Sequence, residues 1–189
     1  MKLNLGCGNK RQPEFINVDK FATESTDQVI DLEIMPWPWH DNSTSEIRLI
    51  HVLEHLGQSS DVYLGIMQEI YRICRHGATV TIHVPHPRHD NFIGDPTHVR
   101  AVTPQSLSLF DKSLNDAWKI EGVSAATTLA HFMGVDIRLE SVITVLDYRW
   151  QQKLNSGEVT IESIAIAAND LNNVISEWHI TCVIVKDSL

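Results

Sequence analysis

The sequence predicts an α/β fold with a mostly parallel sheet, and three observations support this. Short apolar runs, each followed by polar or turn residues, recur along the chain and are typical of buried parallel strands. A long amphipathic helical pattern follows the fourth run. A pair of long β-rich segments near the end indicates an antiparallel edge. Strands that alternate with helices favour helices on the faces of such a sheet.

The elements follow from the apolar periodicity and from helix caps. We expect strands over residues 2–5, 14–19, 28–32, 46–53, 78–84, 137–147 and 176–186. The clearest helix covers residues 59–75, with Ser59 or Ser60 as N-cap, basic residues through His76 at its end and Gly77 at the C′ position. We expect two more helices, over residues 103–112 and 160–172.

Length, charge and cysteine content restrict the class of protein. The 189 residues fit one domain, residues 1–189. The net charge of −9 disfavours nonspecific attachment to nucleic acid, which requires clustered Lys and Arg. Cys7, Cys74 and Cys182 lie far apart without metal-binding spacing, as in a reduced cytoplasmic protein. No apolar run is long enough for a bilayer, so we expect no membrane association.

Polar and small residues follow the first three strands in an order that suits a nucleoside. Gly6 and Gly8 allow a tight turn and a close backbone approach to a ligand. Asp19 ends the second strand and can accept both hydroxyls of a ribose, while Asp31 and Leu32 can contact an adenine. Each feature alone also fits a plain turn or a helix-capping acid. Their order after successive strands favours the nucleoside interpretation.

A dinucleotide site is the nearest competing interpretation. Its glycine motif needs a third glycine for close packing of helix and strand, and that position is Arg11 here. The acid at Asp19 also arrives earlier than the usual spacing of about 20 residues. Both observations disfavour a dinucleotide or nucleotide-sugar binder.

Five motifs together resemble the class I S-adenosylmethionine-dependent methyltransferases. They are LNLGCGNK, INVDKF, VIDLE, IHVLEHL and EIYRICRHGATVTIHVPHP, in the order of that family, over about residues 2–110. More narrowly, they look like small uncharacterised bacterial and phage members of the family. The resemblance implies a Rossmann-like, mostly parallel seven-stranded sheet with an antiparallel last strand.

The resemblance also implies a cofactor, S-adenosylmethionine, and the residues that bind it. The backbone around Gly6 and Gly8 would meet the methionine part, Asp19 the ribose, and Asp31 and Leu32 the adenine. His51 would lie beside the methionine part or the acceptor. The full set of expected cofactor residues is Leu5, Gly6, Cys7, Gly8, Asn9, Asp19, Lys20, Asp31, Leu32 and His51. The sequence departs from the family at Lys10, where a third glycine is common, and in the short stretch before the second strand.

Residues 86–135 are expected to cover the acceptor as an insertion in the domain. The stretch HPRHDNFIGDPTHVR carries His86, His89, Asp90, Asp95, His98 and Arg100. His98 or His51 is the candidate general base for a hydroxyl acceptor, with Asp95 to orient His98 and Arg100 to bind an anionic acceptor. A turn at residues 95–97 with a packed His98 is the competing interpretation.

Metal binding and the acceptor are the least determined by sequence. The histidines and carboxylates of this stretch match no compact metal signature, so we expect no metal site. The preferred function is methyl transfer to a small-molecule or sugar hydroxyl. A non-catalytic cofactor-binding module, and methylation of protein or nucleic acid, remain the alternatives. The net negative charge disfavours nucleic acid as a partner. The strands within residues 137–189 could form a homodimer through their edge or be closed within the fold, and the sequence does not decide between these.

Overall fold

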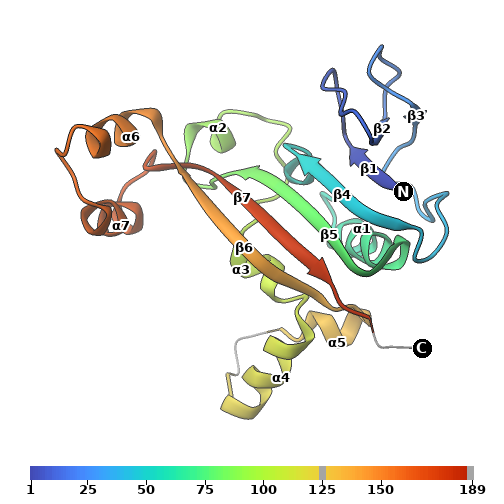
Figure 1. Cartoon of the computed structure of the whole chain (residues 1–189). Coiled ribbons are helices and arrows are strands. Elements are labelled where there is room, and N and C mark those ends of the chain that lie inside the picture. The colour runs from blue at the N-terminus through green and yellow to red at the C-terminus, as the bar shows by residue number, and fades with distance from the viewer. Residues whose placement is uncertain (124–126, 187–189) are drawn as a thin grey trace.

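The computed structural model describes residues 1–123 and 127–186 and contains a seven-stranded sheet (Figure 1). The strand order is β3-β2-β1-β4-β5-β7-β6, and β7 runs antiparallel to both of its neighbours while the other pairs are parallel. This confirms the predicted fold class. The strands are β1 (Lys2–Leu5), β2 (Ile16–Asp19), β3 (Gln28–Val29), β4 (Thr44–Ile50), β5 (Cys74–Pro85), β6 (Ile137–Leu146) and β7 (Ile175–Ile184).

The helices differ from the prediction mainly after residue 86. The helices are η1 (Leu53–His55), α1 (Ser60–Ile73), α2 (Asp90–Ile93), α3 (Pro104–Ser108), α4 (Lys112–Glu121), α5 (Leu129–Met133), α6 (Tyr148–Asn155) and α7 (Ile161–Asp170). Thr103 caps α3 in a capping box, but the helix ends after five residues because Asp111 caps the new helix α4. α6 was not expected, whereas α7 lies within the helix predicted over residues 160–172, with Thr160 as its N-cap.

Several strand boundaries also differ from the prediction: the second strand begins at Ile16 and not at residue 14, and the third ends at Val29 and not at residue 32. The fourth strand ends at Ile50, and the chain then turns into η1 instead of continuing to residue 53. α1 begins after its N-cap Ser59 but ends at Ile73, because Cys74 adopts an extended backbone and begins β5. Arg75, His76 and Gly77 therefore belong to β5 and not to the end of the helix.

Helices cover one face of the central strands, so the expectation of helices on both faces was wrong. Residues of one face are buried against α1 and α3 in a single apolar cluster that includes Ile47, Leu49, Val80, Ile82, Ile70 and Phe110. Residues of the other face, such as Glu46, Arg48 and Thr81, are half-exposed. The reason is local: connections 6–15, 20–27 and 30–43, all described, contain no helix.

A polar network replaces the missing first crossover helix. Asn17 is fully buried, and its amide oxygen accepts hydrogen bonds from the Asn4 side chain (2.9 Å) and the Gln12 backbone (2.8 Å). Its amide nitrogen donates to the carbonyls of Gln12 and Phe15 and to Asp27. These bonds satisfy loop backbone groups that a helix would otherwise pair.

The edge where β1, β4 and β5 end carries the functional loops. The register pairs Pro85 at the end of β5 with Glu177 near the start of β7, and Leu146 at the end of β6 with Ile175. The segment holding α6 and α7 therefore leaves and rejoins the sheet at this carboxyl edge. α5 precedes the start of β6, so α5 and the adjoining α4 lie at the opposite edge (Figure 1). Among the described residues, no helix is long and apolar enough to cross a membrane.

We predict that Asn17→Ala lowers the free energy of unfolding by about 2–4 kcal/mol, because several buried loop groups lose their only side-chain partner. Urea denaturation followed by circular dichroism measures this. Asn155→Ala is the matched control, since the exposed Asn155 bonds only to Gln151 one helical turn away, and should change stability by less than about 0.5 kcal/mol. Equal effects of the two substitutions would show that the Asn17 network is not what holds the loop.

Candidate cofactor and acceptor site

A cavity of about 590 Å³ opens at the carboxyl edge of the sheet. Such a volume is in the usual range for a small-molecule site. Six of the residues expected to bind a cofactor line it: Gly6, Asp19, Lys20, Asp31, Leu32 and His51. The other lining residues are Phe21, Ile30, Glu33, Val52, His55, Leu56 and Thr97. These seven residues were not predicted from sequence as site residues, because the prediction considered mainly the polar residues at the ends of the strands.

The glycine turn after β1 forms one wall of the cavity. Gly6 and Gly8 both have positive φ, +70° and +51°. A Cβ on Gly6 would lie 2.4 Å from Val52 Cγ2, so only glycine fits there. Four expected cofactor residues do not line the cavity: Leu5 and Cys7 are buried in the core, and Gly8 and Asn9 are exposed. Burial raises the pKa of the Cys7 thiol, which fits an inert core residue.

Asp19 connects the turn to the end of β2. Its Oδ2 accepts a hydrogen bond from the Gly8 backbone (2.8 Å), and its Oδ1 accepts from the Phe21 backbone (3.0 Å). Each carboxylate oxygen has a further lone pair, so the group can still accept from a ligand. Asp19 therefore both shapes the turn and faces the cavity.

Lys20 and Asp31 face each other across the cavity wall. Their charged groups are 2.8 Å apart, and the hydrogen bond from Lys20 lowers the pKa of Asp31. Asp31 is thus ionised at neutral pH and can only accept hydrogen bonds. Lys20 is more than half exposed, so its ammonium can move away from Asp31 at little cost.

The two tryptophans after β3 anchor a loop and do not line the cavity. Trp37 and Trp39 are buried, and the Arg72 guanidinium donates to both of their carbonyls. Glu69 accepts from the Trp37 backbone and pairs with Arg72, which lowers the pKa of Glu69. These contacts anchor the loop to α1.

His51 stands where the cavity meets a second hollow of about 280 Å³. Its φ of +56° is unusual for a residue with a side chain and marks local strain. Its Nε2 lies 3.1 Å from Glu177, and its Nδ1 lies 3.5 Å from Glu54. The two carboxylates raise the pKa of His51, Glu54 having the larger effect.

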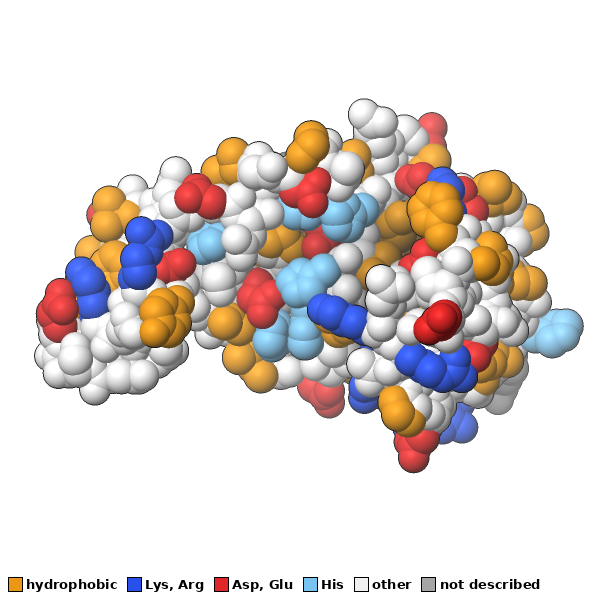
Figure 2. Space-filling view, turned by 90° about the horizontal axis from the view of Figure 1, so that it is seen from above, with side chains coloured by type: hydrophobic (Ala, Val, Ile, Leu, Met, Phe, Trp, Pro, Cys, Tyr) orange, Lys and Arg blue, Asp and Glu red, His pale blue; other side chains and the backbone are white. Residues whose placement is uncertain are grey.

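His98 lies in the second hollow and does not line the larger cavity. Its Nδ1 contacts the Phe92 carbonyl at 2.9 Å, and its ring packs between Phe92 and His55. Asp95 Oδ2 lies 3.8 Å from His98 Nε2, while Asp95 Oδ1 accepts from the backbone and hydroxyl of Thr97. The chain therefore forms the turn of the competing interpretation, yet places His98 next to His55 and Glu54. Figure 2, which views the molecule from above Figure 1, shows histidine and acidic side chains gathered near the middle of the surface.

The other candidates of residues 86–135 have different surroundings. The Arg100 guanidinium donates to the Gly57 carbonyl and lies over the Tyr63 ring. Arg100 lines neither hollow, and its anion-binding role stays a prediction. His86 packs against Trp178, and His89 pairs with Asp147 at 3.3 Å. Neither these two histidines nor Asp90 line the two hollows.

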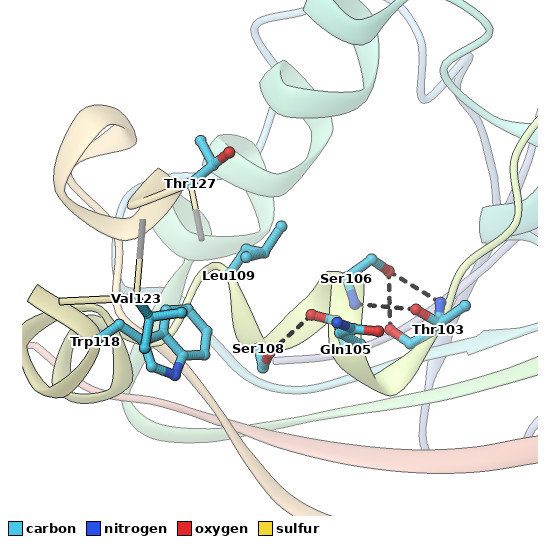
Figure 3. Close-up of a pocket in the computed structure, with 8 residues that line it drawn as sticks. All are labelled: Thr103, Gln105, Ser106, Ser108, Leu109, Trp118, Val123 and Thr127. Atoms are coloured by element: carbon cyan, nitrogen blue, oxygen red, sulfur yellow. Dashed lines mark hydrogen bonds between the residues drawn. The ribbon is translucent and has the colours of Figure 1, made fainter. Parts of the chain in front are cut away.

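A further cavity, of about 480 Å³, lies between α3 and α4 (Figure 3). Its lining side chains are Thr103, Gln105, Ser106, Ser108, Leu109, Trp118, Val123 and Thr127. Ser106 and Thr103 bond to each other in the cap of α3. None of these residues is an acid, a base or a nucleophile of raised reactivity, so the cavity lacks groups for proton transfer.

Comparison with solved structures identifies the fold. A S-adenosylmethionine-dependent methyltransferase from Archaeoglobus fulgidus matches 96% of this chain and 84% of its own, with a TM-score of 0.59 and 19% identity. The chain therefore has the class I methyltransferase fold. A Burkholderia thailandensis 1,6-didemethyltoxoflavin-N1-methyltransferase, solved with its substrate and S-adenosylhomocysteine, has a TM-score of 0.54 at 11% identity over 97% and 70% of the two chains.

The methyltransferase fold also supports other chemistry. The [4+2]-cyclase SpnF matches 98% of this chain and 75% of its own, with a TM-score of 0.52 and 13% identity. No protein-family model matches the chain, and no curated protein matches it in sequence. The likeness is thus one of fold, and the activity must be argued from the site.

The contact of Gly6 with Val52 gives a test of the turn. Gly6→Ala should lower the free energy of unfolding by about 3 kcal/mol, because left-handed strain adds to the clash with Val52. Gly8→Ala is the matched control, with similar strain and no atom within 4 Å of its Cβ, and should cost about 1 kcal/mol. Urea denaturation compares the two variants, and a cost for Gly8→Ala equal to that for Gly6→Ala contradicts the packing argument.

Proposed function

We propose that this chain binds S-adenosylmethionine in the cavity at the carboxyl edge and transfers its methyl group to a hydroxyl of a small molecule or sugar. The observation that carries the proposal is the set of groups lining one cavity in this fold. Gly6 of the glycine turn, Asp19 at the end of β2 and Asp31 after β3 all line this cavity. Parallel sheets bind their ligands at this edge.

The residues present fit the cofactor. Val52 packs directly on Gly6, 2.4 Å from where a Cβ would lie, whereas no described atom lies within 4 Å of a Cβ position on Gly8, so a ligand can approach the backbone of the turn at Gly8. In the proposed mode the turn holds the methionine part and Asp19 accepts from the ribose hydroxyls. Asp31 then accepts from the adenine amino group, with Ile30 and Leu32 as apolar contacts.

The chain's own groups would align the acceptor. The cofactor supplies a methyl group already activated by the sulfonium charge, so the main task is to position the nucleophile. Of the two candidate bases, His51 is better placed than His98, because His51 lines both hollows. His51 is then the group that accepts the hydroxyl proton. Asn91, Asp95 and His98, from the first part of residues 86–135, line the second hollow, which makes this stretch a candidate for the cover of the acceptor.

The three cysteines are buried and unpaired, which fits a reducing compartment, so we place the protein in the cytoplasm. The long edge strand β6 has exposed residues along its middle, including Val142 and Ile143. It is the surface through which a homodimer would form, if the protein forms one.

Calorimetric titration with S-adenosylhomocysteine tests the cofactor site. We expect micromolar binding that Asp19→Ala weakens at least about tenfold, or about 1.4 kcal/mol, because the ribose loses its acceptor. Asp61→Ala, which removes an exposed acid at the start of α1, is the matched control and should bind as the native protein does. Tighter binding of NAD, or equal affinity of the Asp19 and Asp61 variants, would contradict the proposal.

Turnover separates an enzyme from a binding module. With radiolabelled S-adenosylmethionine and a panel of sugar, phenol and amine acceptors, we expect transfer to a hydroxyl, reduced about tenfold or more by His51→Asn. Binding of the cofactor without transfer to any acceptor would support the non-catalytic module instead.

A further inference from the structure

We propose that Glu54, His55 and His98 form a binding site for a divalent transition metal ion of the zinc type, beside the cofactor cavity. One ligand atom from each residue lies within 4.8 Å of those of the other two. All three residues line the hollow of about 280 Å³. These residues form no compact metal signature in the sequence, because Glu54 and His55 are distant from His98 in the chain.

The Glu54 carboxylate is the first observation that indicates a cation. Glu54 is only 1% exposed, and among the described residues neither of its carboxylate oxygens has a hydrogen-bond partner. The nearest ion-pair group, His51 Nδ1, is 3.5 Å away and does not complete a hydrogen bond. An ionised carboxylate buried in this way is costly unless a positive charge compensates it. His51, whose pKa the Glu54 carboxylate raises, supplies part of that charge near Oε1. Among the described residues no second cationic group pairs with the carboxylate, and a metal ion in the hollow would supply the charge near Oε2.

The orientation of the two imidazoles is the second, independent observation. His98 Nδ1 is 2.9 Å from the Phe92 carbonyl, and His55 Nδ1 is 3.3 Å from the Thr97 carbonyl and 3.0 Å from its hydroxyl. In each ring the Nδ1–H can donate to a main-chain oxygen, which directs the Nε2 lone pair to another partner. Histidines that ligate metals are commonly held in this way.

The backbone fixes the two ligand-bearing segments together. The Glu54 carbonyl accepts hydrogen bonds from the backbone of Val99 (2.9 Å) and Arg100 (3.2 Å). η1 and the segment after His98 therefore cannot separate without breaking these bonds. Ligand atoms of a tetrahedral zinc ion are about 3.4 Å apart, given bonds of about 2.1 Å. Small side-chain rotations would close the remaining gap.

The ligand set selects the class of ion. Two imidazoles with one carboxylate suit Zn²⁺ and related ions, whereas Mg²⁺ prefers oxygen ligands. Three protein ligands leave a coordination position open for water or a substrate oxygen. The hollow shares His51 and His55 with the cofactor cavity, so that open position lies on the acceptor side. This last consequence, that the ion would bind the acceptor oxygen, rests on the proposed function; the binding of the ion does not.

Metal titration of the full chain, after removal of metal with a chelator, tests the site. We expect one equivalent of Co²⁺ to bind with a visible absorption band and one of Zn²⁺ to bind by calorimetry, with Mg²⁺ at least about 100-fold weaker. His55→Ala and His98→Ala should each weaken Zn²⁺ binding at least about 30-fold, because each removes one of three ligands. Glu54→Gln, which keeps the shape of the side chain, should weaken it as well.

The control variant is His131→Ala. His131 lies on α5, is 42% exposed and pairs with Asp116, so it tests for adventitious binding to surface histidines. Its loss should leave the affinity for Zn²⁺ unchanged. Binding that is equally affected by His131→Ala, binding that survives both His55→Ala and His98→Ala, or no stoichiometric binding would overturn the proposal. Circular dichroism of each variant distinguishes a lost ligand from a lost fold.

The metal measurement is independent of the cofactor. Zn²⁺ binding without binding of S-adenosylhomocysteine would leave the metal site in place and refute the proposed function. The reverse result would refute the metal site alone.

Discussion

The parallel pairing of β1 with β2 and β4 is the constraint on which the rest of the site depends. Leu5 lies opposite Val18 on one side and Leu49 on the other. The residues that follow these positions, Gly6 and Asp19 among them, therefore leave the sheet at the same level. Ile50 is paired with His83 on β5, which brings His51 to that level as well. The backbone hydrogen bonds of the sheet thus bring together segments that are far apart in sequence.

The connections between the first four strands contain no helix, and the consequences are visible in the polar core of the sheet. Without crossover helices before β4, half-exposed residues such as Arg48 and Thr81 remain on one face. Buried Asn17 takes over the pairing of loop backbone groups. Polar groups are costly to bury unless they form hydrogen bonds. The side-chain amide of Asn17 meets that condition, because it takes part in five hydrogen bonds. Glu54 does not meet this condition, because neither of its carboxylate oxygens has a hydrogen-bond partner among the described residues, and for this reason we propose it as a metal ligand.

Prediction from sequence succeeded where local signals are strong. The short apolar runs predicted the order of the strands, and the caps at Ser59 and Thr103 predicted two helix starts. The ends were less predictable: α3 stops early because a second cap follows at Asp111, and β3 keeps only two residues. The expected cover over residues 86–135 stays a prediction, although its later helices α4 and α5 lie at the opposite edge of the sheet.

The sequence by itself determined the α/β class, the glycine turn and the acids after β2 and β3, because each of these depends on residues adjacent in the chain. Only the tertiary structure decided that helices cover one face, that Leu5 and Cys7 belong to the core, and that Glu54 is buried beside His55 and His98. These facts depend on which segments pack together, and the hydrogen bonds from Val99 and Arg100 to the Glu54 carbonyl join segments that no local pattern relates. The burial of the Glu54 carboxylate without a hydrogen-bond partner among the described residues arises only when the chain is packed, and it is the observation from which we propose Glu54 as a metal ligand.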